Sequence, residues 1–202
     1  MSDLGNQIFE VATARFMSLG IKSVSMDDLA RIMGISKKTL YQFFENKEDL
    51  VNQAIVRHIN LERQHISELI DLATDAVHEM VEVSRHAVRM FRSIKPALLY
   101  DLQKYYRSCW HEISEFHEGF IRTTIKDNLK RGMEEGYYRD DIDAEIISKL
   151  YVMKSYSLVD ETAFPLGEYQ RETLLKQHVM YHLYGILSKK GQAHLDDFKI
   201  SE

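Results

Sequence analysis

The sequence predicts an all-α protein in which a three-helix helix-turn-helix domain precedes a larger helical domain. Three observations predict this fold class. Apolar residues recur at spacings of three and four along the 202-residue chain, without the alternation typical of strands. Only Pro96 and Pro165 interrupt a chain of globular composition, 45% hydrophobic and 28% charged. Capping and turn residues also cluster between residues 25 and 46.

Local signals define the first four helices. The apolar face of the first helix comprises Ile8, Ala12, Phe16 and Leu19. Gly20 ends this helix. The residues that can cap the second, third and fourth helices are Ser25, Ser36 and Asn46. Asp28 follows Ser25 by three residues, which favours a capping box at the start of the second helix.

The apolar periodicity of the remaining sequence predicts further long helices, which brings the expected number of helices in the chain to about nine. They are expected near residues 75–92, 96–106, 109–135, 143–159 and 168–188. A polar turn is expected over 137–141 and a break over 164–167, and the chain from Lys189 is expected to fray. The predicted domains are residues 1–46 and residues 47–202.

The charge distribution favours one small basic surface on an acidic body. The net charge is −5, yet residues 31–47 carry a local charge of +3 and residues 1–46 are neutral overall. The whole acidic excess therefore lies in residues 47–202. Contact with a polyanion is expected from the N-terminal residues alone, with modest non-specific binding.

Composition also indicates the compartment. No window approaches the length of a membrane span, and the N-terminal residues lack the pattern of a secretion signal. Cys109 is the single cysteine, so an internal disulfide cannot form. We therefore expect a cytoplasmic protein with no membrane partner.

Residues 26–44 meet the requirements of a helix-turn-helix. Two short helices that cross steeply need a small residue at the crossing, and Ala30 provides it. Gly34 provides a turn residue that tolerates positive φ. The apolar inner faces comprise Leu29, Met33, Ile35 and Leu40. The outer face of the second helix would then expose Lys37, Lys38, Tyr41 and Gln42 to a DNA major groove.

The same stretch resembles the N-terminal signature of the TetR/AcrR family of bacterial transcriptional regulators. The resemblance is dense over residues 8–50. The matching residues are those of 24–30, 34–36, 39–41, Phe44 and 46–50. Phe43 departs from the pattern, since relatives usually carry His or Tyr there, so a phosphate hydrogen bond from this position is not expected. The resemblance implies DNA binding at the N-terminus and a helical ligand-binding and dimerisation domain behind it.

The resemblance also implies roles for individual residues. Lys37, Lys38 and Gln42 are expected to read base edges, because Lys donates to guanine acceptors and Gln pairs with adenine. Thr39 and Tyr41 are expected at phosphates or thymine methyl groups. The complete expected DNA-binding set is Ser25, Met26, Ser36, Lys37, Lys38, Thr39, Tyr41, Gln42 and Lys47. Alternatives remain open: the two lysines can be a solvated charged pair, and Tyr41 can be a core residue.

A homodimer is expected through the last two long helices. The apolar stripes that suggest it are Leu174, Leu175, Val179, Leu183, Ile186 and Leu187, and Ile146, Ile147, Leu150 and Tyr151. Burial of these stripes within one protomer is the alternative. An unknown small-molecule effector is expected in the same domain, at Trp110, Phe116, His117, Phe120 and Tyr156. For each of these aromatic residues, ordinary core packing is the alternative.

Other site chemistries find little support. His178 and His182 have a spacing that can bind metal, but they fall on an apolar stripe, so no metal site is predicted. Cys109 is expected to be a buried structural thiol rather than a redox sensor. The sequence has no phosphate loop and no nucleophile motif, so neither a cofactor nor an enzymatic activity is expected.

The sequence therefore predicts a ligand-responsive repressor that binds a near-palindromic double-stranded DNA operator as a dimer. The alternative is a DNA-binding regulator or architectural protein controlled by a protein partner, without a small ligand.

Overall fold

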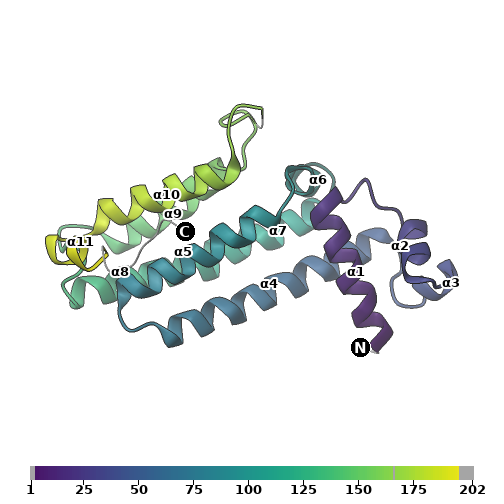
Figure 1. The fold of residues 1–202 in the computed structure, drawn as a ribbon, viewed down its shortest axis with the longest axis horizontal. Coiled ribbons are helices and arrows are strands. Elements are labelled where there is room, and N and C mark those ends of the chain that lie inside the picture. Colours follow the sequence, from purple (N-terminus) through teal and green to yellow (C-terminus); the bar gives the residue numbers. More distant parts are fainter. Residues whose placement is uncertain (1–2, 166, 196–202) are drawn as a thin grey trace. The chain divides into compact units, whose positions relative to one another are not determined.

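A computed structural model describes residues 3–165 and 167–195, and Figure 1 shows its helices in sequence order. These residues contain no β-strand, and one isolated antiparallel bridge links Tyr138 to Leu187. The predicted all-α class is therefore confirmed. The chain divides into an N-terminal unit, Met1–Leu61 with Ser93–Ser114, and a C-terminal unit, Glu62–Arg92 with Glu115–Glu202. The predicted boundary after residue 46 lies inside the N-terminal unit, and a functional division there stays a prediction.

The N-terminal unit is built around an aromatic and aliphatic core. Its helices are α1 (Asp3–Leu19), α2 (Met26–Met33), α3 (Lys37–Leu40), the first part of α4 (Lys47–Leu72), α6 (Pro96–Tyr105) and most of α7 (Arg107–Phe116). Gly20 ends α1 with a φ of 82°, which L-residues with a side chain rarely adopt. The Phe9 and Phe44 rings meet edge to face with centroids 5.0 Å apart, which fixes α1 against the chain after α3.

The C-terminal unit has its own core. Its helices are the rest of α4, α5 (Ala76–Ser93), η1 (His117–Ile121), α8 (Arg122–Glu134), α9 (Ala144–Ser157), α10 (Arg171–Ile186) and α11 (Lys189–Leu195). Asp143 caps α9 by accepting hydrogen bonds from the backbone N–H groups of Glu145 and Ile146. Val77 and Met80 of α5 pack in one cluster with Val179 and Leu183 of α10.

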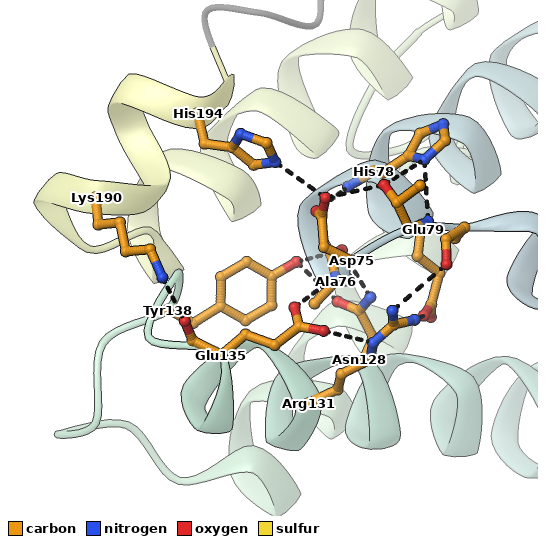
Figure 2. A network of polar contacts seen from close by, with 12 residues as sticks. Asp75, Ala76, His78, Glu79, Asn128, Arg131, Glu135, Tyr138, Lys190 and His194 are labelled. Carbon is orange, nitrogen blue, oxygen red and sulfur yellow. Dashed lines mark hydrogen bonds and ion pairs between the residues drawn. The ribbon is translucent and has the colours of Figure 1, made fainter.

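A buried polar network joins α5, α8 and the chain after α8 (Figure 2). The Asn128 amide donates to the Ala76 carbonyl at 2.9 Å, and the Tyr138 hydroxyl lies 2.9 Å from that carbonyl and from Asn128 Oδ1. Arg131 lies 3.2 Å from the buried Glu79 carboxylate and 2.8 Å from that of Glu135. Because each of these polar groups has a hydrogen-bond or ion-pair partner, burying them costs little free energy.

The same network holds the last described helix. His194 Nε2 of α11 lies 3.0 Å from Asp75 Oδ2, and the Lys190 ammonium donates to the Glu135 carbonyl at 2.7 Å. The prediction that the chain frays from Lys189 is therefore wrong as far as Leu195, and residues 196–202 lie outside the described residues. Local sequence patterns could not predict this helix, because the residues that hold it, Asp75 and Glu135, are distant in sequence.

One further local prediction is incomplete and another is wrong. The helix expected over 109–135 contains a π-helical segment, η1, which accommodates one extra residue per turn between α7 and α8. Tyr138, expected in a polar turn, is only 2% exposed, because its ring packs on the backbone of Gly132. Its hydroxyl still finds polar partners there, which is what allows a tyrosine to be buried.

Candidate functional site

The start of α2 is fixed by the predicted capping box. Ser25 Oγ accepts a hydrogen bond from the Asp28 N–H at 3.1 Å, and Asp28 Oδ2 accepts one from the Ser25 N–H at 3.0 Å. The Ser25 hydroxyl also donates to Asp28 Oδ2 at 2.6 Å, and this hydrogen bond, together with the one from the Ser25 N–H, holds the pKa of Asp28 below its usual value. The first turn of α2 is therefore defined by two residues that are adjacent only when it is helical.

Gly34 makes the turn between α2 and α3. Its φ of 65° and ψ of 25° are left-handed, and the next N–H, of Ile35, donates to the Ala30 carbonyl at 3.0 Å. Ala30 is 5% exposed, as expected of a small residue beneath a helix crossing. The local geometry is that of a helix-turn-helix.

The second helix of the motif has a buried side and an exposed side. Leu40 is 0% exposed and anchors α3 in the core. Lys37, Lys38, Tyr41 and Gln42 are all exposed, as the sequence predicts. Ser36 caps α3 by accepting the Thr39 N–H at 3.0 Å, so its side chain orders the exposed residues that follow it.

Three cations of this region have partners within the N-terminal unit. Lys37 Nζ lies 2.6 Å from Asp27 Oδ1, and Arg31 pairs with Asp28. The Lys47 ammonium donates to the Ile21 carbonyl at 2.6 Å, and burial lowers its pKa. Lys47 thus fixes the α1–α2 connection, and its phosphate contact stays a prediction. Within the described residues, Lys38 has no such partner.

Two neighbouring side chains point inward. Met26 is 6% exposed in the core, so a DNA contact at this position would come from its backbone N–H at the start of α2. Phe43 is half-buried against the same core, with its ring centroid 6.5 Å from that of Phe44. Phe43 therefore packs, as its lack of a donor leads us to expect.

Comparison with known proteins agrees with this geometry. Residues 8–54 match the family model described as bacterial regulatory proteins of the tetR family. This range covers α1 through the first turns of α4 and contains the whole helix-turn-helix. Over these residues the chain matches the TetR family of DNA-binding transcriptional regulators.

TetR-family relatives extend the likeness beyond this domain. An uncharacterized HTH-type transcriptional regulator, YhgD of Bacillus subtilis, is 26% identical over 72% of this chain and 78% of its own length. The HTH-type transcriptional repressor KstR2 of Mycolicibacterium smegmatis is 21% identical over 94% and 93%. A putative transcriptional regulator from Saccharomonospora viridis, solved in complex with choline, has a TM-score of 0.73 at 17% identity over 94% and 100%.

Four of the residues predicted to bind an effector come together in the C-terminal unit. The Phe116 and Phe120 rings stack with centroids 5.6 Å apart. The His117 ring lies 5.6 Å from the rings of Phe116 and Tyr156. Arg63 of α4 places its guanidinium carbon 5.1 Å from each phenylalanine ring. This aromatic cluster combines apolar surface with one imidazole and one cation.

His117 carries the polar group of this cluster that lacks a partner. Its Nδ1 is buried and has no hydrogen-bond partner among residues 3–165 and 167–195, which is uncommon and costly inside a folded protein. His117 also opens the π-helix η1, a distortion often found at functional sites. Trp110, also predicted to bind the effector, belongs to the N-terminal unit and is packed against that unit's core.

We expect acid to destabilise the C-terminal unit. Burial lowers the pKa of His117 and of His178 to about 4. Burial, followed by the charges of His178 and Lys154, lowers that of His182 to about 3. The unfolded chain binds these protons near pH 6.5, so stability is complete above that pH and is lost as pH falls toward 4. Each histidine should cost roughly 1.4 kcal/mol per pH unit in that window.

Urea unfolding followed by circular dichroism at neutral and mildly acidic pH measures this loss. His182→Leu removes one buried imidazole and should retain more stability in acid than the wild-type chain. An unfolding midpoint that does not move with pH would contradict the burial of these three side chains.

The stripe predicted to form the dimer on α10 lies inside the protomer. Leu175, Val179, Leu183, Ile186 and Leu187 are buried in the core of the C-terminal unit, and Leu174 packs against it. That part of the prediction is wrong, because this stripe belongs to the core of the protomer's own C-terminal unit. The exposed apolar residues of α9 and α10 are instead Ile146, Leu150, Met153, Tyr181 and Tyr184. Lys154 links the two helices by placing its ammonium 4.4 Å from the Tyr181 ring.

The described residues give little support for a metal site, a membrane span or a reactive cysteine. No group of three potential metal-binding side chains occurs within residues 3–165 and 167–195, and no helix there is long and apolar enough to cross a membrane. Cys109 is 1% exposed and lies 2.7 Å from Asn52 Oδ1, and burial raises its pKa to about 11. A thiol held in its protonated form is a poor nucleophile, which agrees with a structural role.

Proposed function

We propose that this chain is a cytoplasmic TetR-family repressor that binds a near-palindromic operator as a homodimer and leaves it when a small, largely apolar effector binds. The observation that carries the proposal is the exposed face of Lys37, Lys38, Tyr41 and Gln42 on a segment anchored by Leu40. Residues 1–46 would read DNA, and residues 47–202 would bind the effector and the second protomer.

The exposed face of α9 and α10 supports the dimer. Ile146, Met153 and Tyr184 are 57%, 56% and 55% exposed, and apolar side chains in such a group gain stability when a second copy covers them. Two copies related by a two-fold axis would present their α3 segments to successive major grooves, roughly 34–36 Å apart or a multiple of that distance.

The aromatic cluster of the C-terminal unit supports an effector site. An apolar effector with one polar group could lie on the Phe116 and Phe120 rings and hydrogen-bond His117 Nδ1, which otherwise lacks a partner. A relative named as a repressor and a structural neighbour solved with choline are consistent with a ligand-controlled regulator.

Arg63 provides a route from the effector to DNA. It lies on α4, a continuous helix that contributes residues to both units, and its guanidinium lies over both phenylalanine rings. An effector that takes this place must displace Arg63, and so favours a different position of α4. Binding would then shift the population toward a form unable to fit the operator.

The effector site is tested by replacing His117 and measuring operator release. Small apolar metabolites extracted from bacterial cells should weaken operator binding by the wild-type chain and have a smaller effect on His117→Phe. Operator binding that no extract changes, together with co-purification of a specific protein, would favour control by a protein partner instead.

Gln42→Ala should relax sequence preference at one base pair of each half-site. A glutamine that pairs with adenine through two hydrogen bonds discriminates by roughly 1–3 kcal/mol, and alanine cannot replace either bond. Gel shifts over a series of single-base operator variants measure this. Tyr41→Ala is the matched control, because loss of a contact with a DNA phosphate should weaken binding to all operator variants alike. Equal losses on all variants for Gln42→Ala would refute its assignment.

A further inference from the structure

The first turn of α2 places two carboxylates beside the cations of the DNA-facing surface. Asp27 Oδ1 lies 2.6 Å from Lys37 Nζ, with the two side chains 67% and 55% exposed. Asp28 pairs with Arg31 one turn later. The local positive charge predicted from residues 31–47 is therefore reduced by two residues that precede that range.

These two aspartates have different structural duties. Asp28 completes the capping box with Ser25 and so stabilises α2. Within the described residues, the Asp27 side chain makes only the ion pair with Lys37. An exposed ion pair contributes little to folding. Asp27 also lies in the first turn of α2, where a carboxylate favours the helix dipole, but its ion pair with Lys37 is what connects it to the DNA-facing residues.

Asp27 reduces the positive charge that Lys37 presents to DNA. Its hydrogen bond and charge raise the pKa of Lys37, so the ammonium stays charged but is already neutralised by a neighbour. To contact DNA, Lys37 must exchange the carboxylate for a nucleic-acid acceptor. A guanine edge in an operator offers two acceptors at a defined position. Binding to mixed-sequence DNA relies mainly on phosphates, which the Asp27 carboxylate repels.

We propose that Asp27 is a specificity-determining residue, which keeps binding to non-operator DNA weak by pairing with Lys37 until operator bases replace it. This inference rests on the proposed function, in which the Lys37 side of α3 faces the groove. Asp27 is not one of the predicted DNA contacts. Its role would be to set how strongly those contacts bind DNA of non-operator sequence.

The test compares Asp27→Asn with the wild-type chain on a fluorescent duplex of mixed sequence, by anisotropy over a range of salt concentrations. Releasing Lys37 adds about one phosphate contact, so the slope of log K against log salt should steepen by about 0.9. Affinity for mixed-sequence DNA near 0.1 M salt should rise about 5- to 10-fold. Operator affinity should rise less, so the ratio of operator to mixed-sequence affinity should fall.

Three variants distinguish this effect from a change in net charge. Asp27→Glu keeps the carboxylate and should retain wild-type affinity for mixed-sequence DNA. Glu10→Gln makes the same charge change at an exposed position of α1 and should leave that affinity unchanged. In a Lys37→Gln background, Asp27→Asn should give no gain. Thermal unfolding should show that each variant folds, since the Ser25–Asp28 capping box is untouched.

The outcomes separate this inference from the function on which it rests. Equal affinities of the wild-type chain and Asp27→Asn would overturn the inference alone. The same holds if Glu10→Gln reproduces the gain, or if the gain persists without Lys37. Failure of the wild-type chain to bind any duplex at low salt would overturn the proposed function as well.

Discussion

Gly132→Ala should destabilise the C-terminal unit by about 3 kcal/mol, the upper end of what an extra methyl group in a packed core typically costs. A Cβ at this position of α8 would lie 2.1 Å from Tyr138 Cδ2 and 2.3 Å from Cε2, far inside van der Waals contact. The ring cannot move aside freely, because its hydroxyl lies 2.9 Å from the Ala76 carbonyl and from Asn128 (Figure 2). Moving it would leave buried polar atoms without partners.

Thermal unfolding of Gly132→Ala measures this effect. The matched control is Gly119→Ala, because a Cβ at Gly119 meets no atom within 4 Å. We expect Gly119→Ala to unfold near the wild-type temperature and Gly132→Ala to unfold well below it. Similar unfolding temperatures for the two variants would mean that Tyr138 does not pack on Gly132.

Met153→Arg should convert the dimer to monomers and weaken operator binding by about 100- to 10,000-fold, because a second half-site bound by a linked partner contributes on that scale. Met153 is 56% exposed, so arginine can stand there without disturbing the fold of the protomer. In a dimer closed through this face the guanidinium would be buried next to Lys154, and residues 146–159 include no Asp or Glu that could pair with it.

Sedimentation velocity at micromolar concentration and gel shifts on an operator measure the two effects together. Leu72→Arg is the matched control, because Leu72 is 77% exposed in the same unit but lies on α4. A Met153→Arg variant that remains dimeric would exclude this face of α9 and α10 as the interface.

The helix-turn-helix could be predicted from the sequence because the interactions that define it are local. Ser25 and Asp28 are three residues apart, and Gly34 follows Ala30 by four, so each interaction closes within one helical turn. Gln42 lies in the turn just after α3, two positions beyond the buried Leu40, and is exposed as the sequence predicts. Local periodicity is sufficient for such a motif.

The C-terminal unit could be predicted less well because its determinants are distant in sequence. An apolar stripe such as that of Val179 and Leu183 has the same pattern whether its own chain or a second copy covers it, and here its own chain does. The partners of Tyr138 are Asn128 and Ala76, and the pairing with Ala76 spans 62 residues. The charge of Asp27 was likewise counted in the sequence, but its pairing with Lys37 needed the fold.

The central claim is that two copies of α3 read duplex DNA through the residues that follow Ser36. Selection of bound DNA from a random pool tests it most directly, with the full-length chain as bait. We expect an enriched inverted repeat whose half-site centres lie about one helical turn, or a multiple of it, apart. Loss of that enrichment in a Lys37→Ala/Lys38→Ala variant would link the repeat to α3. A pool without enrichment, or an enriched single site without a repeat, would contradict the claim.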